Sequence, residues 1–141
     1  MSVATTFNVN STNATSANVA AILGRVLISA IFIQAGLSKL TAISGTIGYI
    51  EAAGLPLAPV ALAVAVALEV VGGIALIVGF KTRWVAAALA LFSVVTAFAF
   101  HGNIADQNQF IHFFKNIAIA GGLLQLVAFG GGALSLDARK R

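Results

Sequence analysis

The stretch Leu57–Gly79 reads LAPVALAVAVALEVVGGIALIVG, and Glu69 is its one ionisable residue. A helix of this length, rising about 1.5 Å per residue, just spans the roughly 30 Å hydrocarbon core of a bilayer. Glu69 then lies near the midplane, where a carboxylate costs about a few kcal/mol unless it is paired, protonated or hydrated. The stretch therefore predicts an integral membrane protein in which Glu69 faces the interior of a helix bundle.

The composition of the whole chain agrees with this prediction. Of 141 residues, 60% are hydrophobic and 9% are charged, whereas soluble domains usually carry about a quarter charged residues. The lipid bilayer is thus the expected surrounding, and the few basic residues are too sparse for a nucleic-acid surface. Because the chain has no cysteine, disulfides, thiol redox cycles, iron–sulfur clusters and zinc–thiolate sites are excluded.

Three further hydrophobic stretches have the length of a membrane span, namely Ala20–Leu40, Arg83–His101 and Phe110–Gly130. They predict an all-α protein, an integral membrane four-helix bundle. The connection Thr41–Pro56 carries apolar residues at helical spacing before Gly54. We therefore expect a short interfacial helix between helices 1 and 2, with an irregular loop as the alternative.

The chain divides into three parts. Residues 1–18 are rich in Ser, Thr and Asn, carry no charged side chain, and lack the basic start and apolar core of a signal peptide, which predicts an uncleaved, flexible tail. Residues 19–138 form the membrane domain, and 139–141 a basic terminus. Six of the eight Lys and Arg residues fall on the side of the two termini, so the positive-inside rule places both termini in the cytoplasm.

Polar residues within the spans predict two sites. An extended Arg25, about 8 Å from the cytoplasmic end, could reach Glu69, so we expect a buried charge pair between them. Helical periodicity also directs Gln125 into the bundle interior. The Arg25–Glu69 pair is either structural or part of a proton-handling or quinone-contacting site, and a protonated Glu69 bonded to a backbone carbonyl is a further alternative.

A second group of polar residues lies near the outer ends of the first, third and fourth spans. The candidates for an outer polar pocket are Lys39, His101, Lys115 and Asn116. Cations and amide donors at that position would suit a small anion or a quinone head group, although the same residues could simply anchor helix ends at the interface. His101 and His112 without a further Cys, His or carboxylate cluster make a poor metal or haem site, so no metal is predicted.

The order of several short motifs resembles a known family. These motifs are Gly24-Arg25, Gly36-Leu37-Ser38-Lys39-Leu40, Gly54-Leu55-Pro56, Leu68-Glu69-Val70-Val71-Gly72-Gly73, Gly79-Phe80-Lys81-Thr82-Arg83, Phe114-Lys115-Asn116 and Leu134-Ser135-Leu136-Asp137. Together they look like the DoxX family of small bacterial inner-membrane proteins, over about residues 20–138. The resemblance implies a four-helix membrane bundle. One branch of that family is associated with thiosulfate:quinone oxidoreductase, and others with membrane-bound redox or oxidative-stress assemblies.

Three functions remain open from the sequence. The chain has no cysteine, nucleotide-binding fingerprint or strong metal cluster, so any redox chemistry must come from a bound quinone, a haem or a partner. This favours a non-catalytic membrane subunit or scaffold that docks a redox enzyme. The alternatives are a quinone-interacting subunit of an oxidoreductase such as thiosulfate:quinone oxidoreductase, and a small-solute transporter that works as a homo-oligomer.

Overall fold

The computed structural model describes residues 9–139, and all of its regular structure is helical. The six helices are α1 (Val9–Thr41), α2 (Ile43–Ala52), α3 (Ala58–Val78), α4 (Thr82–His101), α5 (Gln107–Phe129) and α6 (Leu136–Arg139). Four of them, α1, α3, α4 and α5, are long and apolar enough to cross a membrane. The predicted membrane four-helix bundle and the short helix between its first two spans are thus confirmed.

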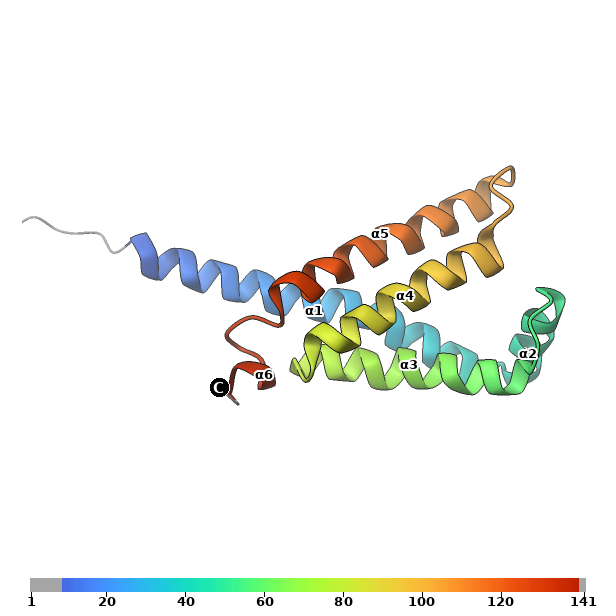
Figure 1. Cartoon of the computed structure of the whole chain (residues 1–141), viewed down its shortest axis with the longest axis horizontal. Coiled ribbons are helices and arrows are strands. Elements are labelled where there is room, and N and C mark those ends of the chain that lie inside the picture. The colour runs from blue at the N-terminus through green and yellow to red at the C-terminus, as the bar shows by residue number, and fades with distance from the viewer. Residues whose placement is uncertain (1–8, 140–141) are drawn as a thin grey trace, which may run out of the picture.

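The N-terminal segment differs from the expectation of a flexible tail. Helix α1 continues without a break back to Val9, so residues 9–18 are helical and extend beyond the other helices (Figure 1). Ser, Thr and Asn lower helix propensity only modestly, and a long apolar helix that follows them can propagate into such a segment. Residues 1–8 of the predicted tail and residues 140–141 of the basic terminus lie outside the described part.

The bundle consists of two helix pairs. The most extensive contacts are those between α1 and α3 and those between α4 and α5, and the tight turn at residues 79–81 joins the pairs. Gly36 and Gly73 allow α1 and α3 to approach closely: a Cβ atom on Gly36 would lie 2.6 Å from Cγ2 of Val70, and one on Gly73 would lie 2.7 Å from Cγ1 of Ile33. Small residues serve this purpose widely in membrane helices.

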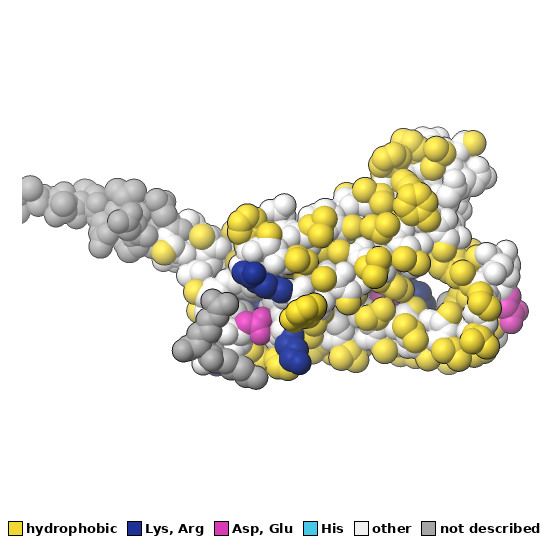
Figure 2. Space-filling model, viewed as in Figure 1, with side chains coloured by type: hydrophobic (Ala, Val, Ile, Leu, Met, Phe, Trp, Pro, Cys, Tyr) yellow, Lys and Arg dark blue, Asp and Glu magenta, His cyan; other side chains and the backbone are white. Residues whose placement is uncertain are grey.

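The two pairs are packed together at one end and separate at the other (Figure 1). The fully buried side chains Leu76, Leu89 and Leu123 form the core where the pairs meet. At the opposite end, α2 packs against the start of α3 through Ile50, Ala58 and Leu62. Side chains therefore fill the bundle at the end where α6 lies, and a hollow opens between the pairs towards α2 (Figure 2).

Candidate functional site

Glu69 forms an ion pair with Lys39. The ammonium Nζ of Lys39 donates to both carboxylate oxygens of Glu69 at 2.8 Å, and it also lies 3.4 Å from the carbonyl oxygen of Ala35. Glu69 is 4% exposed, whereas the side chain of Lys39 is 27% exposed. The pair joins α1 to α3, and all three donor positions of the ammonium are directed at protein oxygens.

The predicted pair between Arg25 and Glu69 is wrong. Arg25 is 1% exposed, but its guanidinium donates to backbone carbonyl groups: Nη1 to those of Leu76 and Ile77 at 3.3 and 3.1 Å, and Nη2 to that of Leu134 at 2.9 Å. Carbonyls in the last turn of a helix have no partner within the helix, and a cation there also complements the helix dipole. Arg25 therefore ties the end of α3 to the C-terminal segment.

The direction of side chains on a helix explains why Glu69 pairs with Lys39 and not with Arg25. Arg25 and Lys39 lie on the same side of α1, so helical phase alone does not distinguish them. Side chains on a helix lean towards its N-terminus. Lys39 consequently reaches back towards the middle of the bundle, as its contact with Ala35 shows, whereas Arg25 leans away from Glu69 towards the segment that leads into α6.

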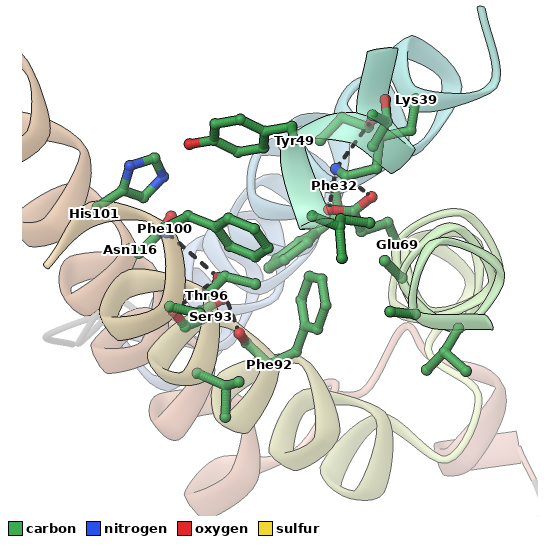
Figure 3. Close-up of a pocket in the computed structure, with 18 of the residues that line it drawn as sticks. Phe32, Lys39, Tyr49, Glu69, Phe92, Ser93, Thr96, Phe100, His101 and Asn116 are labelled. Carbon is green, nitrogen blue, oxygen red and sulfur yellow. Dashed lines mark hydrogen bonds and ion pairs between the residues drawn. The ribbon is translucent and has the colours of Figure 1, made fainter. Parts of the chain in front are cut away.

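The Lys39–Glu69 pair forms part of the wall of a cavity of about 550 Å³ between the two helix pairs (Figure 3). Most of the wall is apolar, and the side chains of Phe32, Phe92 and Phe100 line it (Figure 3). Its volume lies within the range of about 300–1,000 Å³ that small-molecule sites usually have. The cavity thus combines an apolar interior with a small number of polar groups.

Helix α2 covers the end of the cavity that lies opposite α6. Tyr49 on α2 stacks on Phe100 of α4, with ring centroids 5.2 Å apart and ring planes inclined by 18°. This contact links the α1–α3 pair, on which α2 rests, to the α4–α5 pair. The short interfacial helix therefore contributes directly to the site, and the Tyr49 hydroxyl lies on the same side of the cavity as His101 (Figure 3).

All four residues proposed for the outer polar pocket, Lys39, His101, Lys115 and Asn116, line this cavity. Asn116 donates through Nδ2 to the Thr96 hydroxyl at 3.4 Å, and Nδ1 of His101 lies 2.7 Å from Oε1 of Gln109.

Lys115 lies at the rim of the cavity. Its side chain is exposed and donates to Nδ1 of His112 at 2.7 Å. The four residues thus share one cavity, and a role for them as a polar binding pocket stays a prediction.

The histidine geometry does not fit a haem. The rings of His101 and His112 stack face to face, with centroids 5.1 Å apart, so their nitrogen atoms do not converge on one shared position between them. Within residues 9–139, no group of three or more His, Cys, Asp or Glu side chains could hold a metal ion.

Gln125 does not face the bundle interior, contrary to the prediction. Its side chain is exposed, and α5 packs through Ala120 and Leu123 on another side. Lys115, which helical phase places near Gln125 on α5, lies instead at the rim of the cavity. Helical phase gives the relative direction of side chains on α5, but not the neighbour that each one meets.

The sequence reasoning missed several lining residues. Tyr49, Phe32, Ser93 and Thr96 were not singled out, although Tyr49 is the chain's only tyrosine and falls in the predicted interfacial helix. Its amphipathic ring was the available signal. Ser93 and Thr96 donate to backbone carbonyls of their own helix, which is common in membrane helices and marks no site.

Comparisons with known proteins agree with this architecture. The family model described as DoxX matches residues 20–102. The chain is 41% identical over 120 residues to inner membrane protein YqjF of Escherichia coli K12, covering 85% of this chain and 91% of YqjF. It is 35% identical over 124 residues to inner membrane protein YphA of the same strain, covering 84% and 88%. No solved structure matches. This chain is thus a multi-pass inner-membrane protein that belongs to the DoxX family.

Proposed function

We propose that this protein is a non-catalytic membrane subunit of a redox or oxidative-stress assembly, and that it binds a quinone in the cavity between its helix pairs. The observation that carries the proposal is the cavity itself, which is mostly apolar and has polar groups at its outer end. A quinone matches this distribution because its ring and tail are apolar and its two carbonyl oxygens accept hydrogen bonds.

Three side chains would hold the head group. Within the described residues, no hydrogen bond engages the Tyr49 hydroxyl or Nε2 of His101, and Asn116 uses one of its two amide hydrogens. Donors placed at the end of a low-dielectric site stabilise negative charge on an oxygen, which is the charge that a quinone gains on reduction. Lys39 is not counted among these donors, since its hydrogen bonds go to Glu69 and Ala35 and its charge is neutralised by the Glu69 carboxylate.

The cavity favours a quinone-binding subunit over a scaffold that only docks an enzyme and over a transporter. A scaffold that only docks an enzyme has no need for an internal hollow. A transporter needs a path to both sides of the membrane, whereas Leu76, Leu89 and Leu123 are fully buried at the far end. Arg25 closes the same end through its carbonyl contacts.

We also propose that both termini are cytoplasmic and that the cavity opens towards the opposite side. The support is the bias of basic residues towards the end with the termini, where Arg25, Lys81, Arg83 and Arg139 lie, whereas Lys39 and Lys115 lie at the other end. Basic residues are retained in the cytoplasm during insertion.

The test uses two alanines on α3. Ala61 lines the cavity, and Ala63 is exposed on the outside of the bundle. Purified wild-type protein and the variants Ala61→Phe and Ala63→Phe would be titrated calorimetrically with a short-chain ubiquinone analogue in detergent. We expect Ala61→Phe to weaken binding at least about tenfold, because its ring fills the site, whereas Ala63→Phe binds as the wild type does.

Equal binding by both variants would show that the quinone only partitions into the micelle, and the proposal would be withdrawn. Absence of quinone binding together with a co-purifying enzyme would favour the scaffold function instead.

A further inference from the structure

A second hollow lies at the other end of the bundle, far from the quinone cavity. It measures about 500 Å³ and is formed by the start of α4, the end of α5 and the C-terminal segment that leads into α6. Figure 2 shows Lys or Arg side chains gathered at this end of the molecule, with an acidic side chain between them. The lining residues that matter here are Lys81, Arg83, Trp84, Phe129 and the glycines at 130–132.

Asp137 holds this hollow in shape. Its carboxylate accepts hydrogen bonds from the backbone amides of Lys81 at 2.7 Å and Thr82 at 2.8 Å, and its own amide donates to the carbonyl of Gly79 at 3.0 Å. These bonds cap the start of α4 and fix the C-terminal segment against the turn that joins the helix pairs. The walls of the hollow are therefore set by hydrogen bonds between distant parts of the chain.

Two cationic side chains of the hollow, Arg83 and Lys81, form no ion pair among residues 9–139. Arg83 has no ion-pair or side-chain hydrogen-bond partner among residues 9–139, and its Nε lies 3.5 Å from the position that a Cβ atom of Gly130 would take. The ammonium of Lys81 lies 5.9 Å from the centroid of the Phe80 ring, and it makes no ion pair within the described part of the chain. The carboxylate in the wall, Asp137, already accepts from two backbone amides. An anion would thus find two cationic side chains available.

Aromatic side chains flank the same hollow and face outwards. Trp84, two residues into α4, is 80% exposed, and Phe129, the last residue of α5, is 78% exposed. Aromatic rings at the ends of membrane helices lie at the level of lipid head groups. A soluble anion would gain nothing from these rings, whereas a lipid would place its phosphate in the hollow and its glycerol and upper acyl chains against them.

We propose that this hollow binds the phosphate group of an anionic phospholipid in the leaflet on the side of the termini. Arg83 and Lys81 contact the phosphate, and the backbone amides of Gly131 and Gly132, which donate no hydrogen bond to another described residue, supply further donors. Basic pockets at the ends of membrane helices are a recognised environment for such head groups. The inference stands independently of the quinone cavity, since the two hollows share no lining residue.

The chain provides its own reporter, because Trp84 is its only tryptophan. Protein reconstituted in phosphatidylcholine would be titrated with phosphatidylglycerol brominated on its acyl chains, which quenches tryptophan fluorescence on contact, and separately with brominated phosphatidylcholine. We expect the anionic lipid to quench Trp84 more strongly at equal mole fraction. The variant Arg83→Gln should lower that preference by about fivefold, the factor that one basic contact contributes at an anionic surface.

Arg139→Gln is the matched control, because Arg139 is exposed at the same end and does not line the hollow. It should leave the preference unchanged, and unaltered quenching by the brominated phosphatidylcholine would verify that both variants remain folded and inserted. Equal quenching by the two lipids, or equal effects of the two variants, would overturn the proposal. Displacement of the brominated phosphatidylglycerol by millimolar inorganic phosphate would overturn it as well, because the ligand would then be a soluble anion.

Discussion

Replacing Lys39 by Met tests whether the Lys39–Glu69 pair holds α1 against α3. The substitution keeps the length and apolar stem of the side chain but leaves the Glu69 carboxylate, which is 4% exposed, without a partner. Breaking a buried pair in this way typically costs about 3–5 kcal/mol of unfolding free energy. Glu69→Gln should cost only about 1 kcal/mol, because the 27% exposed side chain of Lys39 can turn to water in the cavity.

The double variant Lys39→Met/Glu69→Gln contains no unpaired charge, so it should be nearly as stable as Glu69→Gln alone. The expected coupling energy between the two positions therefore equals the cost of Lys39→Met alone, about 3–5 kcal/mol. It would be measured by titrating each purified variant with SDS in mixed micelles and following unfolding by circular dichroism.

Two controls make the outcome specific. Lys81→Met removes an exposed lysine from the other end of the bundle and should change the unfolding free energy by less than about 0.5 kcal/mol. The cycle of Arg25→Met with Glu69→Gln should be additive, because Arg25 bonds to carbonyls and not to Glu69. Additive effects of the Lys39 and Glu69 substitutions, or strong coupling between Arg25 and Glu69, would refute the assignment of partners.

Three further predictions concern backbone conformation, capping and topology. Gly79 and Gly54 both have positive φ, of 72° and 75°, but a Cβ atom on Gly79 would collide with Arg25 and Ser135 whereas one on Gly54 meets nothing within 4 Å. Gly79→Ala should thus lower the thermal midpoint of unfolding much more than Gly54→Ala does, because Gly54→Ala costs only the conformational strain of about 1–3 kcal/mol. Equal midpoints for the two variants would contradict the close packing of Gly79 against Arg25 and Ser135. Asp137→Ala should destabilise the protein by about 1 kcal/mol through loss of the α4 cap, and an unchanged SDS midpoint would argue against it. Because the chain has no cysteine, single cysteines can report topology: an impermeant maleimide applied to intact cells should label position 108 and not position 17, and the reverse pattern would invert the proposed orientation.

The membrane fold could be predicted from the sequence because its physical cause is local. Four stretches of about 20 apolar residues satisfy the length of a bilayer crossing, and in lipid only a helix satisfies its own backbone hydrogen bonds. The interfacial helix at Ile43–Ala52 was predictable for the same reason, since its apolar spacing lies within one segment. The helical state of residues 9–18 was not, because it depends on propagation from the neighbouring span.

The candidate site could be predicted only in part. The position of each residue along its span predicts that Lys39, His101, Lys115 and Asn116 lie at one end of the bundle, and in the structure all four line one cavity. The predicted partner of Glu69 was wrong. Arg25 and Lys39 are 14 residues apart, so they lie on nearly the same side of the helix and phase does not distinguish them. Because helical side chains lean towards the N-terminus, Lys39 and not Arg25 reaches Glu69. The prediction that Gln125 faces the bundle interior was wrong, because helical phase identifies a polar face but not the neighbour that this face meets.

The sequence by itself therefore determined that the chain crosses the membrane four times and that a buried carboxylate lies in its third helix. These properties follow from the free energy of transferring short segments into lipid, which depends on each segment's own composition. Only the tertiary structure decided that Lys39 neutralises Glu69, that Arg25 closes the opposite end and that Tyr49 covers a cavity between two helix pairs. Such contacts depend on the rotation, tilt and separation of packed helices, which small residues such as Gly36 and Gly73 set jointly across the bundle.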